Sequence, residues 1–148
     1  MKRGTYFSEF EIGQKYTSGR RTVTEADVVL FAGLSGDYNP LHTDRVFAEA
    51  TPFGQRIAHG MLSASISTGL AQNVGVFEGT TIALMEQVFR YKAPVFFGDT
   101  IHMSLTVEGL KPSSKGGRGV VTFKSEVIKQ DGTVVIEGQW TVMMRDQA

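Results

Sequence analysis

The sequence predicts an α+β protein in which one long central helix is wrapped by a curved antiparallel sheet. Two observations support this prediction. A helical segment over 60–73 is built mostly from small residues, and the chain after about residue 80 alternates apolar and polar residues with the period of a strand. The two halves therefore differ in character: the first favours helix and loop, and the second favours strands.

The first half begins with a short polar strand candidate over 15–23, which can join the edge of the sheet. Thr24 then caps a predicted helix, because Asp27 follows three residues later at the favourable end of the helix dipole. Gly36 is typical of a helix end. The apolar stripe of this helix is formed by Val28, Phe31 and Leu34.

Two further helices are expected before the sheet. A short one starts at Asp44 and ends before Pro52. The helix over 60–73 is rich in Ser, Thr and Gly, which are indifferent or poor helix formers, so propensity alone does not explain it. Small side chains allow other backbone to come close, which suits burial inside a wrapping sheet. Its larger residues are Met61, Leu62, Ile66 and Leu70.

The second half predicts four strands. The first ends near Pro94, and alternation marks the others over 101–108, 121–127 and 134–144. Asp131-Gly132 is typical of a hairpin turn, and the sequence KPSSKGGRG forms a longer, flexible connection. The short links favour a meander in sequence order.

The composition limits the function classes. A chain of 148 residues fits one domain, 1–148, and its formal net charge of zero argues against a nucleic-acid partner. There are no cysteines, and no apolar run approaches the ~20 residues of a membrane span. The opening segment lacks the apolar stretch of a secretory signal, so we expect a cytoplasmic protein. Charge neutrality is compatible with specific self-association.

The sequence GDYNPLH contains two titratable groups, Asp37 and His42. Their spacing of five brings them together on neither an ideal helix nor a strand. Gly36 and Pro40 instead predict a bend, with no helix between the two groups, that turns His42 back towards Asp37. A facing pair can hold one water molecule and move its protons, which is typically worth 10²–10⁴-fold in rate. Because these residue types are also common in turns, a structural turn stays open as an alternative.

Gly60 lies in the first turn of the small-sided helix, where its amide has no intrahelical acceptor. Such an amide, at the positive end of the dipole, can bind the oxygen of a polarised carbonyl. Close packing of another group against the helix is an equal explanation for this glycine.

Three segments in order, LSGDYNPLH, AHGML and YKAPVFFGDT, resemble the MaoC-like dehydratases, the (R)-specific enoyl-CoA hydratases. The similarity runs from about Thr22 to the last strand. It implies the hot-dog fold, with Asp37 and His42 as the catalytic dyad, Asn39 in support and the Gly60 amide on the thioester oxygen. It also implies water addition to trans-2-enoyl-CoA, giving (R)-3-hydroxyacyl-CoA, or the reverse dehydration. The expected assembly is a homodimer or an oligomer of dimers.

The resemblance implies no metal and no cofactor other than the coenzyme A that the substrate carries. His59 is expected to shape the helix start. Candidates for the acyl pocket, with core filling as the alternative, are Thr68 (a serine in some relatives), Met85 and Phe89. Candidates for contacts to CoA phosphates, with ordinary solvated charge as the alternative, are Arg90, Lys92, Lys115 and Arg118.

Two other functions stay open. A hot-dog thioesterase would hydrolyse a saturated acyl-CoA, but such enzymes do not generally carry the GDxNPxH pattern. An acyl-CoA-binding subunit with an idle site would bind the thioester without turnover, but no residue of the motif is lost. The acyl group and the pathway are not fixed by the sequence.

Overall fold

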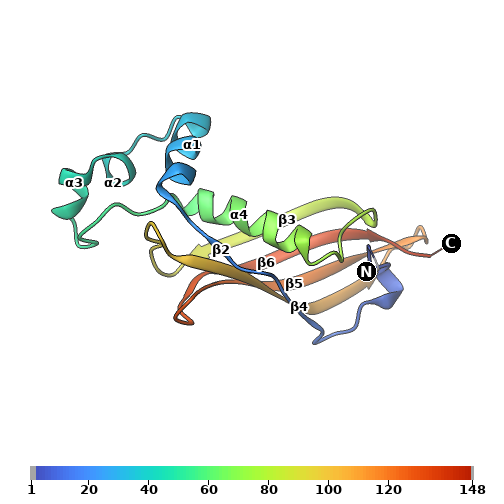
Figure 1. The fold of residues 1–148 in the computed structure, drawn as a ribbon. Coiled ribbons are helices and arrows are strands. Elements are labelled where there is room, and N and C mark those ends of the chain that lie inside the picture. Colours follow the sequence, from blue (N-terminus) through green and yellow to red (C-terminus); the bar gives the residue numbers. More distant parts are fainter. Residues whose placement is uncertain (1–2, 148) are drawn as a thin grey trace.

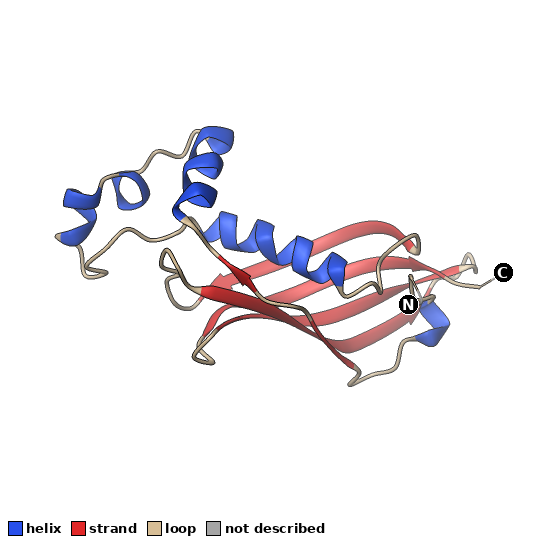
Figure 2. Cartoon of the chain, in the orientation of Figure 1, coloured by secondary structure: helices blue, strands red, loops and turns tan. Residues whose placement is uncertain are grey.

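A computed structural model gives the fold and describes residues 3–147. Figure 1 shows its elements in chain order, and Figure 2 separates helices from strands. The elements are η1 (Phe7–Glu9), β1 (Lys15–Thr17), β2 (Arg21–Thr22), α1 (Glu25–Ser35), α2 (Pro40–Thr43), α3 (Arg45–Glu49), α4 (Gly60–Asn73), β3 (Thr81–Tyr91), β4 (Thr100–Pro112), β5 (Arg118–Lys129) and β6 (Val134–Arg145).

The strands form one antiparallel sheet in the order β1-β4-β5-β6-β3, with β2 also paired to β4. Helix α4 lies along one face of this curved sheet, and α1 to α3 project beyond the end where α4 begins (Figure 1). The predicted α+β architecture with one central helix is therefore confirmed. No helix within residues 3–147 is long and apolar enough to cross a membrane.

The expected meander is wrong in one respect, because β3 pairs with β6 and not with β4. The segment 92–99 passes across the end of the sheet, from β3 at one edge to β4 next to the other edge, since Tyr91 pairs with Ile136 while Thr100 pairs with Thr22. A backbone hydrogen bond from Lys92 N to the Val135 oxygen, 2.8 Å, holds the start of this segment. Alternation within a strand carries no information about which edge the strand occupies.

The polar strand over 15–23 does join the sheet edge, but it is split into β1 and β2. Ser18 lies at the break. Its amide donates to the Met103 oxygen at 2.9 Å, and its hydroxyl oxygen accepts from the Met103 amide at 2.8 Å. The Ser18 side chain thus takes the place of a backbone acceptor in the pairing with β4.

Helix α1 begins as expected. Asp27 N donates to Thr24 Oγ1 at 3.3 Å, and Thr24 N donates to Asp27 Oδ2 at 2.9 Å, which is a reciprocal capping box. Gly36 ends the helix with φ +75°, a conformation that favours glycine. The predicted apolar stripe is wrong at Leu34, which is 84% exposed, because this end of α1 projects beyond the sheet (Figure 1).

The core lies between α4 and the sheet. The buried side chains of α4 alternate with its exposed ones at helical spacing, and the predicted alternation of β4, β5 and β6 is confirmed by burial. The buried residues that face each other there include Leu62, Ile66, Leu70, Met103, Leu105, Phe123 and Trp140.

A buried ion pair fixes the segment that crosses the sheet end. Lys129 Nζ contacts Asp99 Oδ2 at 2.9 Å, and their side chains are only 10% and 12% exposed. Asp99 also accepts from Gln130 Nε2 and from the Phe96 amide, both at 2.8 Å. Burial opposes ionisation of Asp99, but the hydrogen bonds from Gln130, Lys129 and Phe96 outweigh it and lower the pKa of the carboxyl.

We expect Asp99→Asn to lower the free energy of unfolding by about 3 kcal/mol at pH 7, because it leaves the buried Lys129 ammonium without its carboxylate. Because the pKa of Asp99 is lower in the folded state, its carboxylate stabilises the fold at pH values above 3.8, the ordinary pKa. This stabilisation is lost as the pH falls through the lower, folded-state pKa. Urea unfolding at pH 7 and at successively lower pH measures this. The variant and the parent should converge in acid, and a constant difference would contradict the assignment.

Candidate active site

The loop after α1 orients the Asp37 carboxylate through its own backbone. Asn39 N donates to Asp37 Oδ1 at 3.2 Å, and Asp37 N donates to Ser35 Oγ at 3.1 Å. Asn39 also caps the next turn, because its Oδ1 accepts from Leu41 N at 3.0 Å. Asn39 therefore supports both the carboxylate and the element that carries His42.

The expectation that Pro40 excludes a helix here is wrong. Pro40 begins the one-turn helix α2, and His42 lies on it. Proline is tolerated at the first position of a helix because the amide it lacks would have no intrahelical partner. The bend is instead made by Asp37, Tyr38 and Asn39, between the left-handed Gly36 and this turn.

His42 has a defined tautomer. Its Nδ1 lies 2.7 Å from the Ile57 oxygen. A carbonyl oxygen only accepts, so Nδ1 carries the proton and Nε2 of the neutral ring is left with its lone pair. That nitrogen is the one available to take a proton from a water molecule. Ile57 is held in turn by Phe96 of the segment that crosses the sheet end.

His59 lies behind both groups and is only 2% exposed. Its Nε2 donates to the Asp37 carbonyl oxygen at 2.9 Å. Its ring stacks on the His42 ring, with 3.8 Å between centroids and 27° between planes, while Phe31 packs on it at 4.9 Å. One buried ring therefore positions both residues of the expected dyad. The sequence places His59 beside the helix start, but nothing in it indicates this stacking.

The structure brings Asp37, His42 and His59 together, with one ligand-type atom of each lying within 4.8 Å of the others. The expectation that the bend faces Asp37 towards His42 is consistent with this geometry. Such a cluster suits transfer of protons to and from one water molecule. A carboxylate and two imidazoles are also a donor set that a transition-metal cation accepts.

Gly60 is the first residue of α4, and close packing requires that this residue has no side chain. A Cβ atom built there would lie 2.7 Å from Tyr91 Cε1. The Gly60 amide has no backbone acceptor among residues 3–147. A first-turn amide also has no acceptor within its own helix. The close approach of the Tyr91 ring and the free amide are therefore both properties of this glycine.

A cavity of about 570 Å³ lies between the start of α4 and the segment 91–95. Its lining is mostly apolar. The lining residues are Phe53, Ile57, Ala58, Gly60, Met61, Ser63, Tyr91, Lys92, Ala93, Pro94, Val95 and Ile136. The cavity thus reaches the helix N-terminus that Asp37 and His42 flank, although neither of these two residues lines it.

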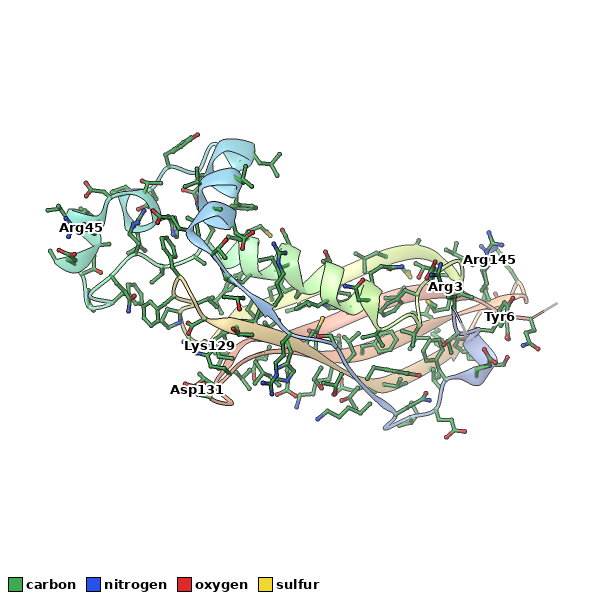
Figure 3. All side chains as sticks on the ribbon, viewed as in Figure 1. Arg3, Tyr6, Arg45, Lys129, Asp131 and Arg145 are labelled. Atoms are coloured by element: carbon green, nitrogen blue, oxygen red, sulfur yellow. The ribbon has the colours of Figure 1, made fainter. Side chains whose placement is uncertain are left out.

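The basic candidates fall in two groups. Lys92 lines this cavity and pairs with Glu137 at 3.6 Å, and Arg90 is exposed nearby on β3. Arg118 pairs in register with Arg145, at the end of the sheet opposite Asp131 and Lys129 (Figure 3), and Lys115 precedes it. Within one chain, Lys115 and Arg118 are therefore remote from Gly60.

The acyl candidates are also separated. Thr68 lines a second, smaller cavity of about 170 Å³ near the other end of α4. Met85 is 53% exposed on the edge strand β3, and Phe89 packs against the core. Neither Met85 nor Phe89 is among the lining residues of the two cavities.

A curved antiparallel sheet around one helix, with an acid–base cluster at the helix N-terminus, defines a hot-dog protein with a site suited to proton transfer. Residues 8–130 match the family model described as a MaoC like domain. The chain belongs to this family.

Three comparisons illustrate the relationship. An (R)-specific enoyl-CoA hydratase of Rhodospirillum rubrum is 43% identical, over 94% of this chain and 91% of that protein. A structure described as a monoamine oxidase regulatory protein from Archaeoglobus fulgius has a TM-score of 0.90 and 37% identity, and the match covers 99% and 98% of the chains. A double-hotdog protein of Mycobacterium tuberculosis shares the fold, with a TM-score of 0.79 and 18% identity, over 97% and 45% of the chains.

Proposed function

We propose that the protein adds water across the double bond of a trans-2-enoyl-CoA thioester to give the (R)-3-hydroxyacyl-CoA, and catalyses the reverse dehydration. The observation that carries the proposal is the convergence of Asp37 and His42 beside the free amide of Gly60. Membership of the MaoC-like family, with a relative named (R)-specific enoyl-CoA hydratase, makes the chain a hydro-lyase.

In the proposed mechanism, Asp37 and His42 Nε2 hold one water molecule from two sides. Removal of a proton from this water lets its oxygen add to C3, and negative charge moves to the thioester oxygen. The Gly60 amide and the positive end of α4 stabilise that charge. A proton returned to C2 from the same side completes the addition, so hydroxyl and hydrogen arrive on one face. The mechanism uses no metal and no separate cofactor.

Contacts to the rest of the substrate are proposed from position. Lys92 in the wall of the large cavity, with Arg90 beside it, stays a candidate for contacts to CoA phosphates. Lys115 and Arg118 can take part only if a second subunit brings them to the site. Thr68, Met85 and Phe89 stay candidates for the acyl side.

A homodimer, or an oligomer built from dimers, is also proposed. Strand β3 forms one edge of the sheet and exposes Ile82, Leu84 and Met85 at 42%, 51% and 53%. An exposed apolar edge strand is a natural surface for pairing with a second copy. We propose that two β3 edges meet, and sedimentation of the purified protein measures the assembly.

The proposed reaction is tested with purified protein and a panel of enoyl-CoAs, starting from crotonyl-CoA and extending to longer and branched chains. Hydration removes the conjugated thioester absorbance without releasing thiol. If no enoyl-CoA of the panel loses this absorbance, the proposed hydratase function is refuted. Release of thiol from saturated acyl-CoA, followed with a thiol-reactive dye, would identify a thioesterase, and tight binding without turnover would identify a binding subunit.

His59 is expected to act as a positioning residue. His59→Phe keeps an aromatic ring against His42 and Phe31 but removes the donor to the Asp37 carbonyl. We expect kcat to fall about tenfold with little change in KM, because one hydrogen bond that orients the dyad is lost. Steady-state kinetics and thermal unfolding, measured together, check this. An unchanged kcat would contradict a positioning role. So would a loss of activity that is explained by lower stability or by a raised KM alone.

A further inference from the structure

The second cavity, of about 170 Å³, lies between the C-terminal half of α4 and the strands β3 and β6. Phe77, Leu84 and Val142 give it apolar walls, and Thr68 borders it from the helix. Its size is close to that of a 150 Å³ protein cavity that accepts benzene, so it can hold roughly six heavy atoms. A group of this size corresponds to the end of an acyl chain.

Two side chains that line this cavity carry buried N–H groups without acceptors in the described part of the chain. They are Trp140 Nε1 and Gln87 Nε2. Trp140 is 5% exposed, and it pairs directly with Gln87 in the β3–β6 register, so both side chains rise from the same face of the sheet. Buried donors almost always have partners, and an indole nitrogen can only donate. Two unpartnered donors on neighbouring side chains therefore suit an oxygen acceptor in this cavity.

The neighbouring hydroxyl groups use their protons elsewhere. Thr68 Oγ1 donates to the Ser65 oxygen at 2.6 Å, and Thr81 Oγ1 donates to the Phe77 oxygen at 3.0 Å. None of the lining residues, all within residues 3–147, is charged. An ionised carboxylate would lose its hydration here without meeting a cation. The donors therefore suit a neutral oxygen, such as a carbonyl or a hydroxyl, better than a carboxylate.

The position of the cavity relates it to the site at the other end of α4. The eight residues from Gly60 to Thr68 span about 12 Å of helix. The stripe formed by Met61, Ser65 and Thr68 is exposed along this length. An extended chain gains about 1.2 Å per bond, since three bonds span 3.3–3.6 Å, so about ten bonds bridge this distance.

We propose that this cavity receives the far end of a medium-length acyl group and recognises a neutral oxygen acceptor there through the N–H groups of Trp140 and Gln87. The proposal rests on the proposed function, because that function places the thioester carbon at the Gly60 amide. It names the substrate class as enoyl-CoA thioesters with a carbonyl or hydroxyl near the end of the chain.

Binding tests the proposal without turnover, because saturated thioesters cannot be hydrated. The probes are dodecanoyl-CoA, its 11-oxo derivative, whose ketone lies ten bonds from the thioester carbon, and the twelve-carbon dicarboxylic thioester dodecanedioyl-CoA. Trp140 is the single tryptophan, so a ¹⁵N-labelled sample gives one indole N–H signal. We expect the 11-oxo thioester to bind about tenfold more tightly than dodecanoyl-CoA and to shift that signal downfield, with dodecanedioyl-CoA the weakest. Equal affinities, or an indole signal that no probe moves, would overturn the proposal.

Two variants separate hydrogen bonding from packing. Trp140→Phe keeps an aromatic ring and removes the donor. We therefore expect it to lower the affinity for the 11-oxo thioester to that for dodecanoyl-CoA, while the affinity for dodecanoyl-CoA changes less than twofold. Gln87→Leu removes the second donor from the edge strand and should act in the same direction, which keeps the test valid if Trp140→Phe does not fold. Equal losses for both probes in the folded variants would overturn the proposal.

The outcome also separates this proposal from the proposed function. If no enoyl-CoA is hydrated but the 11-oxo thioester still binds more tightly through Trp140, the hydratase function fails and the oxygen-binding cavity stands. If medium-chain enoyl-CoAs are hydrated and the probes bind alike, the function stands and this proposal fails.

Discussion

Asp37→Asn is expected to lower kcat for enoyl-CoA hydration by about 10²–10⁴-fold while leaving the fold intact. Asparagine has nearly the same shape, and its side-chain oxygen can still accept the Asn39 amide that now donates to Asp37 Oδ1. What it loses is the negative charge and the ability to carry a proton. Asp37 is exposed, so its replacement should leave thermal unfolding nearly unchanged. Stopped-flow or steady-state absorbance measures the rate.

Asp44→Asn is the matched control for this variant. Asp44 is an exposed carboxylate in the same segment, and it caps α3 by accepting from Phe47 N at 3.0 Å, which asparagine can also do. We expect this variant to retain the parent kcat. Near-full activity of Asp37→Asn would remove Asp37 from the mechanism, and an equal loss in both variants would point to a general charge effect.

His42→Ala is expected to lower kcat by a similar factor of about 10²–10⁴, because it removes the nitrogen that exchanges a proton with water. The variant also loses the hydrogen bond to the Ile57 oxygen and the stacking on His59, so a modest loss of stability, about 1 kcal/mol, should accompany it. Activity should therefore be measured well below the unfolding temperature. His102→Ala, on β4, is the control that should leave kcat unchanged.

The double variant tests whether the two residues act on the same water molecule. Groups that act as a unit give non-additive losses, so Asp37→Asn combined with His42→Ala should be about as slow as the slower single variant. Losses that multiply would mean that Asp37 and His42 act independently, and that one of them has a different role.

Much of the fold follows from local pattern. The Thr24–Asp27 capping box, the bounds of α4 and the burial of alternate residues in β4 to β6 are all readable from the sequence, because each depends on neighbours within a few positions. The place of β3 beside β6 depends instead on the path of segment 92–99 across the sheet end, which the Asp99–Lys129 pair and the Val135 backbone fix. Such contacts join residues far apart in the sequence.

The candidate site shows the same division. The bend at Asp37 and the free amide of Gly60 follow from local rules, whereas the one-turn helix at Pro40 was missed because proline is excluded from helix interiors and not from their first turn. The stacking of His59 on His42 and the unpartnered Gln87–Trp140 pair depend on tertiary packing. No spacing in the sequence indicates either of them.

The configuration of the product tests the central claim most directly. Asp37 and His42 on one side of the site should deliver hydroxyl and hydrogen to the same face of the double bond. Hydration of crotonyl-CoA, or of the best panel substrate, in D₂O should therefore give (R)-3-hydroxyacyl-CoA with deuterium added at C2 syn to the hydroxyl, as chiral chromatography and NMR measure. Anti addition of deuterium would contradict a water molecule held and deprotonated by this pair, and an (S) product would contradict the proposed (R)-specific reaction.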